Sequence, residues 1–380
     1  MIGDALTIGD LKEMARRRVP KMFFDYADSG AWTEGTYRAN EADFAKILLR
    51  QRVLVDMTDR NLASEMIGEP VAMPVALAPT GLTGMQHPDG EMLAAQAAEA
   101  FGAPFCLSTM SICSIEDVAG ATRKPFWFQL YVMRDRDFVE GLIDRAKAAG
   151  CSALVLTLDL QILGQRHKDL RNGLSAPPRW TPKHVWQLAT RPAWCLGMLG
   201  TERRTFRNIV GHAKSVTDLK SLPVWTTTQF DPRLAWTDVG WIRERWGKKL
   251  ILKGILDPED ARRAVDTGAD AIIVSNHGGR QLDGARSSIS ALPRVVEAVD
   301  GRMEVHMDGG VRSGQDVLKA LALGAKGVHI GRPFLWGLGA GGRAGVARAL
   351  EIIRQELDIT MALCGRRDVR EVDAGILDRG

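Results

Sequence analysis

The sequence of 380 residues has little net charge and few cysteines. Lys and Arg number 50 and Asp and Glu number 46, so the formal charge is only +4, too small to indicate a nucleic-acid-binding surface. The five cysteines form no C-x-x-C pair and no cluster with histidine. We therefore expect free thiols in a reducing compartment, no metal site and no nucleic-acid partner.

Long apolar segments are also missing. No apolar run reaches the roughly 18 residues that a membrane span needs. The N-terminal stretch carries acidic residues where a signal peptide would be apolar, and Thr7 followed by Asp10 is typical of a capped helix start. These absences predict a cytosolic protein, and its 45% content of hydrophobic residues is enough for a large core.

What the sequence does contain is a repeated alternation of short apolar runs and helical patterns. Eight runs end at a polar residue or glycine: "PVALAPT", "PFCLS", "FWFQLY", "ALVLTLD", "LILKG", "AIIVSNH", "EVHMDGG" and "GVHIGR". Between most of them lie helical patterns such as "GEMLAAQAAEAFG" and "SGQDVLKALALGA". Eight strand–helix units in succession predict a (β/α)8 TIM barrel, an α/β fold, in a single domain over residues 1–380.

Two segments fall outside this repeat. Residues of about 1–70 precede the first strand and carry helical signals. The fourth run ends at residue 157 and the fifth at residue 253, much farther apart than the other neighbours, which predicts an insertion at about 174–240. Because loops after barrel strands build active sites, we expect the insertion beside the catalytic face.

Polar side chains follow all eight apolar runs. They are Thr80, Ser108, Gln129 with Tyr131, Thr157 with Asp159, Lys253, Ser275 with His277, Asp308, and Arg332. Because the carboxyl ends of barrel strands meet at one mouth, we expect these side chains to form one site. Glycines and arginines in "DGGVRSG" and "GRPF", after the last two runs, predict a phosphate-binding loop there.

The motifs at the strand ends make the chain resemble a known family. "SNHGGRQLD", "FDYADSGA", "LAPTGLTGMQHPDGE", "TLDLQILGQRHKDLRNG" and "DGGVRSGQDVLKALALGA", spread from about Leu6 to Leu363, resemble the FMN-dependent L-2-hydroxy-acid oxidases and dehydrogenases. Members of that family include glycolate oxidase, lactate oxidase and the bacterial L-lactate and (S)-mandelate dehydrogenases. The resemblance implies oxidation of a small 2-hydroxy acid to a 2-keto acid with FMN as cofactor.

The resemblance implies a flavin site at the matching strand ends. It would comprise Pro79, Thr80, Gly81, Ser108, Gln129, Thr157, Lys253, Ser275, Asp308, Gly309, Gly310, Arg312, Gly331 and Arg332. Lys253 would lie beside the N1 and O2 edge of the flavin, where its charge stabilises the reduced form. The residues alone leave two other interpretations of Lys253 open: a salt-bridged core lysine and the nucleophile of a Schiff-base lyase.

Catalytic and substrate-binding roles follow for a second set of residues. His277 is predicted to take a proton from the substrate because imidazole titrates near neutral pH, and Asp159 would orient it. Arg280 would bind the substrate carboxylate with its two-pronged donor geometry. The resemblance adds a second substrate arginine, a carboxylate-binding tyrosine and a hydroxyl-binding tyrosine, at Arg166, Tyr26 and Tyr131. A carbanion route and a hydride route use the same residues, and both stay open.

Two residues bear on the substrate and the electron acceptor. Met110 in "LSTMS" is flexible and apolar, which favours L-lactate and places a bulkier acid such as mandelate second. Gly81 stands where dehydrogenases that use another acceptor often have glycine and oxygen-using oxidases often have alanine. We therefore expect a dehydrogenase that passes electrons to a quinone, with an oxygen-using oxidase as the alternative.

The region 176–215 is basic and rich in tryptophan. It holds seven Lys or Arg and one acid, Glu202, together with Trp180, Trp186 and Trp194. This mixture predicts peripheral contact with the anionic cytoplasmic face of the inner membrane, where a quinone would accept the electrons. The alternative is a lid or subunit-interface element. The resemblance also implies a homo-oligomer, a tetramer or larger.

Overall fold

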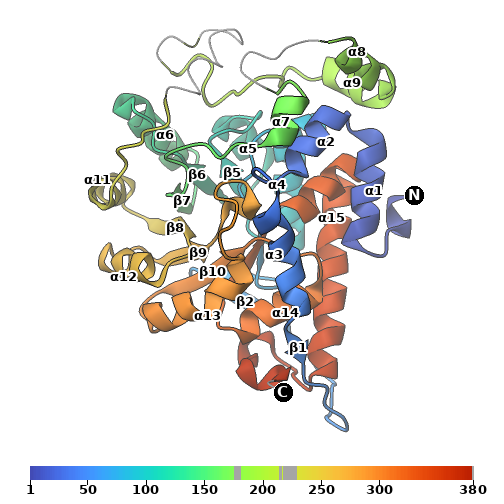
Figure 1. The fold of residues 1–380 in the computed structure, drawn as a ribbon, viewed down its shortest axis with the longest axis vertical. Helices are drawn as coiled ribbons and strands as arrows, with labels where there is room; N and C mark the ends of the chain where they lie inside the picture. Colours follow the sequence, from blue (N-terminus) through green and yellow to red (C-terminus); the bar gives the residue numbers. More distant parts are fainter. Residues whose placement is uncertain (175–180, 214–215, 217–228, 379–380) are drawn as a thin grey trace.

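Eight parallel strands form one closed sheet. The computed structural model describes residues 1–378 except 175–180, 214–215 and 217–228 (Figure 1). The strands are β4 (Val75–Leu77), β5 (Cys106–Ser108), β6 (Trp127–Leu130), β7 (Ala153–Thr157), β8 (Lys249–Ile255), β9 (Ala271–Val274), β10 (Glu304–Asp308) and β11 (Gly327–Ile330). Their order is β4-β11-β10-β9-β8-β7-β6-β5, and a parallel bridge between Leu77 and Phe105 joins the two ends. The predicted TIM barrel is confirmed, with each of the eight runs forming a strand.

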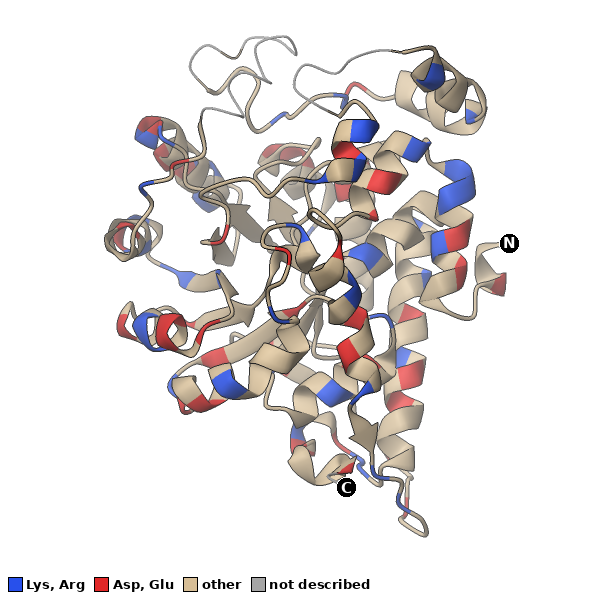
Figure 2. Cartoon of the chain, viewed as in Figure 1, with Lys and Arg blue, Asp and Glu red and all other residues tan. Residues whose placement is uncertain are grey.

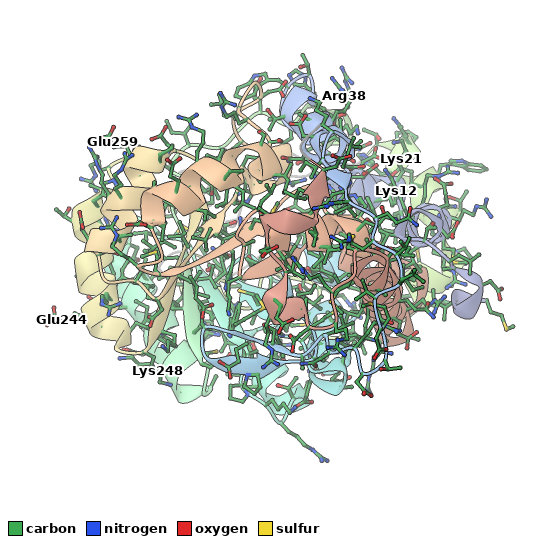
Figure 3. All side chains as sticks on the ribbon, turned by 90° about the horizontal axis from the view of Figure 1, so that it is seen from below. Lys12, Lys21, Arg38, Glu244, Lys248 and Glu259 are labelled. Atoms are coloured by element: carbon green, nitrogen blue, oxygen red, sulfur yellow. The ribbon has the colours of Figure 1, made fainter. Side chains whose placement is uncertain are left out.

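Helices alternate with these strands and surround them. They are α4 (Gly90–Phe101), α5 (Ile115–Ala121), α6 (Arg136–Ala148), α11 (Trp236–Trp246), α12 (Pro258–Asp266), α13 (Ser288–Val299), α14 (Gly314–Ala322) and α15 (Arg332–Leu363). In the view from below, Glu244 on α11 and Glu259 on α12 point away from the barrel (Figure 3). On the same α12, Ala261 and Ala264 are buried, as expected for a helix with one apolar face on a sheet.

The amino end of the barrel is closed by a hairpin. Strands β2 (Ser64–Met66) and β3 (Glu69–Val71) pair in antiparallel fashion. Met66, Ile67 and Val71 of this hairpin pack against barrel-lining side chains such as Trp127 and Ile251. A packed core therefore fills this end, and the open mouth of the barrel lies at the carboxyl ends of the strands.

The chain termini wrap the barrel from outside. Thr7 caps α1 (Ile8–Arg18), as predicted, and α1 packs along α15, which bends at Gly341 and Gly342 (Figure 1). The remaining short elements are η1 (Ile2–Asp4), α2 (Lys21–Ala27), α3 (Gly35–Ala45), β1 (Leu48–Leu49), η2 (Thr83–Met85), η3 (His277–Gly279), η4 (Val369–Glu371), η5 (Ala374–Ile376) and β12 (Leu377–Asp378). Helix α3 contacts η3 and so brings the N-terminal segment to the mouth of the barrel.

The long connection between β7 and β8 carries the helices α7 (His167–Arg171), α8 (Pro182–Ala189) and α9 (Pro192–Leu199). Gln187 of α8 accepts a hydrogen bond from the backbone N–H of Met22 (3.1 Å), and Trp194 of α9 stacks on Phe23 (5.3 Å between centroids), so both helices pack on α2. From Trp236 the chain is already in α11, a helix of the barrel. Trp180 lies outside the described residues. No helix in the described part of the chain is long and apolar enough to cross a membrane.

A pair of histidines lies inside the barrel wall. His306 Nδ1 is 3.1 Å from His329 Nε2, and His306 Nε2 is 3.0 Å from an oxygen of Glu304. Both imidazoles are buried, and burial holds the pKa of His329 well below its usual value, with His306 and Lys253 adding to the effect. The folded protein therefore keeps His329 neutral at pH values where the unfolded chain would bind a proton.

This buried pair predicts a loss of stability in acid. Since the pKa of His329 is lowered on folding, its contribution is complete above pH ~6.5 and is lost as pH falls, at up to about 1.4 kcal/mol per pH unit. Thermal melts from pH 7.5 to 5 should fall more steeply for the wild type than for the double variant His306→Phe/His329→Phe. Parallel curves for the two proteins would contradict this assignment.

Candidate active site

His277 and Asp159 form a pair at the carboxyl ends of β9 and β7. His277 Nδ1 lies 3.0 Å from Asp159 Oδ1, and both side chains are largely buried. The backbone of His277 has a φ of +58°, unusual for a residue with a side chain, and its N–H donates to Ser275 Oγ (3.0 Å). A carboxylate partner makes Nδ1 the protonated nitrogen, which leaves Nε2 as the basic one.

The surroundings keep this pair as a neutral imidazole beside a charged carboxylate. Burial lowers the pKa of His277 and outweighs the opposing effect of Asp159, and the cations Lys253 and Arg166 add to the lowering. Burial alone would raise the pKa of Asp159, but His277 and Lys253 bring it below its usual value. At neutral pH, His277 is therefore ready to accept a proton and Asp159 is ready to stabilise the resulting imidazolium.

Lys253 is a buried cation next to this pair. Its Nζ lies 3.0 Å from Asp308 Oδ2 and donates to Ser275 Oγ at 2.8 Å. Burial would lower its pKa, but Asp308 and Asp159 raise it above the usual value. The neutral amine that a Schiff-base lyase needs is therefore disfavoured at Lys253.

A bulge in β8, the strand that carries Lys253, lets Asp159 approach this strand. The register between β8 and β9 shifts between Lys253 and Ile255. The intervening Gly254 has a φ of +108°, and a Cβ there would lie 2.7 Å from Asp159 Cγ. Only glycine fits this position, because both its backbone angle and the close carboxylate exclude a side chain.

Three buried polar side chains link the neighbouring strands β5, β6 and β7. Ser108 Oγ donates to Gln129 Oε1 (2.9 Å), and Gln129 Nε2 donates to Thr157 Oγ1 (3.0 Å). The three residues are almost completely buried. They form an ordered row of hydrogen-bonding groups at the mouth, beside Lys253.

Two arginines and a tyrosine converge near His277. Arg280 donates to the backbone oxygen of Tyr26 and to Ser29 Oγ (3.0 Å), and its guanidinium lies 4.5 Å from the Tyr26 ring. Burial lowers the pKa of Arg280, and the nearby Arg166 lowers it further. Arg166 and Arg280 are both largely buried and lie near one another, so together they can bind an anion such as a carboxylate.

The predicted apolar and phenolic groups lie beside this cationic site. A Cβ on Gly81 would lie 3.2 Å from Met110 Cβ and 3.3 Å from the Tyr26 hydroxyl, so these three residues meet. The Tyr131 ring packs edge-on against Phe230 at 5.6 Å. Burial and the nearby Asp159 raise the pKa of Tyr131, so its phenol stays protonated and can donate a hydrogen bond.

The predicted phosphate-binding loops after β10 and β11 contain the expected glycines, but their arginines already have protein partners. Arg332 donates to the backbone oxygens of Ala27, Gly278 and Ser29, and burial lowers its pKa to about 10. Arg312 pairs with Glu41 at 2.6 Å. In this structure both arginines thus join the mouth to the N-terminal helices.

Several groups at the mouth fit the FMN that the resemblance implies. Asp308 Oδ1 is buried and has no hydrogen-bond partner among the described residues, so it can accept from a cofactor hydroxyl. Gly331 is the N-cap of α15 and has no side chain to bond the first helix amides, which can therefore face a phosphate. A Cβ on Gly310 (φ +87°) would lie 1.9 Å from the Asn40 oxygen, so the loop with Gly309 can hold its close turn only with glycine.

Two residues that sequence reasoning missed hold the arginines in place. Asp169 on α7 lies 3.6 Å from Arg166 and 3.9 Å from Arg280, and Ser29 accepts from Arg280. Burial raises the pKa of Asp169 despite the two cations. The spacing of three residues between Arg166 and Asp169 was a signal for their pairing, whereas nothing near Ser29 in the sequence pointed to Arg280.

Comparisons with known proteins agree with this arrangement. The profile of the FMN-dependent dehydrogenase family matches residues 15–379. An L-lactate dehydrogenase from Caulobacter vibrioides (strain NA1000 / CB15N) is 48% identical over 97% of this chain and 96% of its own, and one from Ectopseudomonas mendocina (strain ymp) is 47% identical over 97% of both.

Solved structures show the same similarity. The monotopic membrane protein (S)-mandelate dehydrogenase superposes with a TM-score of 0.94 at 36% identity, covering 99% of this chain and 100% of its own. A mandelate oxidase variant with (S)-mandelic acid gives a TM-score of 0.82 at 37% identity over 98% of both chains. With its barrel, its histidine–aspartate pair and its flavin-compatible mouth, this chain belongs to the family of FMN-dependent dehydrogenases.

Proposed function

We propose that this FMN-dependent 2-hydroxy-acid dehydrogenase oxidises L-lactate to the 2-keto acid and passes the electrons to a quinone. The observation that carries the proposal is the 3.0 Å contact between His277 and Asp159 beside the two buried arginines. The named L-lactate dehydrogenases at 47–48% identity support lactate as the substrate. The flexible, apolar Met110 side chain near Tyr26 suits a substrate with a methyl group.

Each residue has a distinct task in the proposed reaction. Arg280 and Arg166 bind the substrate carboxylate, and Tyr131 hydrogen-bonds the hydroxyl being oxidised. His277 Nε2 takes the proton, and Asp159 stabilises the imidazolium. FMN, when bound, supplies a two-electron acceptor. The rigid mouth keeps the acid and the base in fixed orientation, so both proton routes named above remain compatible with these positions.

The same proposal assigns the residues that hold FMN. Ser108, Gln129 and Thr157 supply the polar row, and Lys253 supplies a fixed positive charge. The remaining contacts come from Pro79, Thr80, Gly81, Ser275, Asp308, Gly309, Gly310, Arg312, Gly331 and Arg332. Arg312 and Arg332 contribute positive charge near the phosphate while they keep their protein partners.

The test is an anaerobic titration of the purified yellow protein. L-lactate should bleach the flavin absorbance, and a soluble quinone analogue should restore it faster than air does. Bleaching without faster reoxidation by the quinone would favour the oxygen-using oxidase. A protein that neither L-lactate nor any other L-2-hydroxy acid bleaches would overturn the assignment of the site.

A mandelate-type substrate is the second candidate. It is favoured by the similarity to (S)-mandelate dehydrogenase, at a TM-score of 0.94, and by the flexible Met110 side chain. Steady-state kinetics with both acids decide between them, because the preferred one has the larger kcat/KM.

Helices α8 and α9 support peripheral contact with the cytoplasmic face of the inner membrane. Four of their apolar side chains are largely exposed: Val185 (62%), Trp186 (71%), Leu196 (70%) and Leu199 (70%). Lys183 on α8 and Arg191 in the turn between the helices are basic, and no acidic residue lies on this stretch (Figure 2). The structurally similar (S)-mandelate dehydrogenase is itself described as a monotopic membrane protein. An apolar surface next to cations suits an anionic bilayer that holds a quinone.

Flotation with vesicles checks this contact. The wild type should bind vesicles with 30% anionic lipid, and Trp186→Glu/Leu196→Glu should bind at least about tenfold more weakly, because it places two charges in the interface. Leu54→Glu, which changes a fully exposed leucine in another part of the chain, is the matched control. Equal binding of all three proteins would favour the lid or subunit-interface role. Light scattering on the protein without vesicles tests the homo-oligomer, a tetramer or larger, that the family resemblance implies.

A further inference from the structure

The loop that carries Met110 is held from outside the barrel by Asn208, a residue of the long connection between β7 and β8. Asn208 is completely buried. Its Nδ2 donates to Ser111 Oγ at 2.9 Å, and its Oδ1 accepts from the backbone N–H of Ile115 at 3.0 Å. The one amide therefore holds both ends of the segment that follows Met110.

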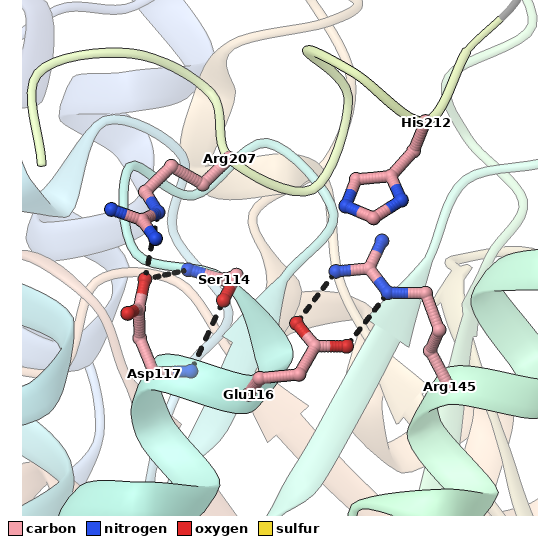
Figure 4. A pocket seen from close by; sticks show the side chains of 6 residues that line it. All are labelled: Ser114, Glu116, Asp117, Arg145, Arg207 and His212. Atoms are coloured by element: carbon pink, nitrogen blue, oxygen red, sulfur yellow. Dashed lines mark hydrogen bonds and ion pairs between the residues drawn. The ribbon is translucent and has the colours of Figure 1, made fainter.

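Hydrogen bonds from Arg145, which is itself paired with Glu116, fix the position of Asn208. Arg145 donates to both the backbone oxygen and Oδ1 of Asn208, each at 3.2 Å, and makes a two-pronged pair with Glu116 at 2.8 and 2.7 Å. Figure 4 shows this pair and, beside it, Arg207 on Asp117 of the same helix α5, at 3.2 Å. The connection is thus bound to α5 through Arg207 and to α6 through Asn208.

The Met110 loop has a second support on its other side. Glu91, buried at the start of α4, accepts from the backbone N–H groups of Gly84 and Ile112, both at 2.9 Å. Met110 also accepts a hydrogen bond from the N–H of Leu82 (3.0 Å). The loop therefore lies between two fixed groups, Glu91 on α4 and Asn208 on the connection, and a shift at Ser111 is passed directly to Met110.

The chemistry of this position requires an amide. Ser111 Oγ donates its own proton to the backbone oxygen of Cys113 at 2.7 Å, so it needs a donor from Asn208. The N–H of Ile115 needs an acceptor. Only an asparagine-sized side chain with one donor and one acceptor satisfies both, and a carboxylate of the same shape lacks the donor.

We propose that Asn208 is a positioning residue through which the connection between β7 and β8 sets the width of the substrate pocket at Met110. The inference rests on the proposed oxidation of 2-hydroxy acids. The preference for small or bulky acids would then depend partly on a residue outside the pocket, because Asn208 acts on Met110 only through Ser111. Loss of its bond to Ser111 widens the pocket and leaves the histidine–aspartate pair unchanged.

The test uses the flavin-loaded enzyme and the ratio of kcat/KM for (S)-mandelate to that for L-lactate. Asn208→Asp and Ser111→Ala should each raise this ratio about three- to tenfold, the worth of one buried hydrogen bond. The change should lie in KM, with kcat for L-lactate within about twofold of the wild type. The double variant should show no further increase, because both changes remove the same interaction. Glu202→Gln, an exposed change in the same connection, should leave the ratio unaltered.

Two results would overturn the inference, and they are distinguishable. An unchanged ratio in folded, flavin-loaded Ser111→Ala, with the wild type active, refutes the role of Asn208 and leaves the proposed function standing. If the wild type oxidises no 2-hydroxy acid, the proposed function fails and the inference fails with it. Should Asn208→Asp not fold, Ser111→Ala decides alone, because it deletes only a hydroxyl.

Discussion

Replacing His277 with glutamine is expected to lower kcat/KM for the preferred 2-hydroxy acid by about 10²- to 10⁴-fold, the usual worth of a positioned base. In the native protein, His277 Nδ1 lies 3.0 Å from Asp159 Oδ1. Glutamine keeps a polar side chain opposite Asp159, but its amide does not act as a base. Steady-state kinetics with L-lactate measure the loss, and flavin absorbance confirms that the cofactor is still bound. Turnover within about threefold of the wild type would remove His277 from the mechanism.

The pH dependence of the wild type provides a second measurement of the same residue. Because burial lowers the pKa of His277, the imidazole is neutral above pH ~6.5, and kcat/KM should fall only at lower pH, as the imidazole becomes protonated. Asp159→Asn should shift this fall in kcat/KM to still lower pH, because the carboxylate raises the pKa of the imidazole. If kcat/KM of Asp159→Asn falls at the same pH as that of the wild type, the pairing of His277 with Asp159 is contradicted.

Replacing Arg280 with methionine is expected to lower kcat/KM by about 10²- to 10³-fold, because the substrate carboxylate would lose a buried, charge-assisted partner. Arg280→Lys should lose less activity, since it keeps the charge without the planar fork. The loss should fall mainly on KM. Kinetics over a wide range of L-lactate concentrations measure it.

The matched control is Arg123→Met, a change of an exposed arginine away from the mouth. It should leave both kinetic constants near those of the wild type. If Arg280→Met and Arg123→Met behave alike, the substrate carboxylate binds elsewhere. Stacking of Arg280 on Tyr26 would then be only a packing contact.

Much of the fold and the site was predictable because it depends on local patterns. A continuous apolar run such as Ala271–Val274 marks a strand buried on both faces, and Ser275 and His277 mark the point where it leaves the core. Repetition of this pattern predicted the barrel, and barrel geometry placed the polar strand ends at one mouth. The 3.0 Å approach of His277 to Asp159 is a consequence of that geometry.

Other features were decided only by the tertiary structure. The sequence left Lys253 open among a core lysine, a flavin contact and a nucleophile, and only the 3.0 Å approach of Asp308 from β10 shows that it is held as a cation. Arg332 turned out to bind backbone oxygens of the N-terminal segment, and Asn208 reaches the Met110 loop across the outside of the barrel.

The sequence by itself therefore determined the class of fold, the location of the mouth and the nearness of His277 to Asp159, because the apolar runs and the polar residues that end them are local features of the sequence. The tertiary structure decided charge states and the support of the loops. Charge states and loop support depend on which groups from distant parts of the chain meet within about 3 Å and on how far water is excluded from them. The order of residues along the chain does not specify such distances.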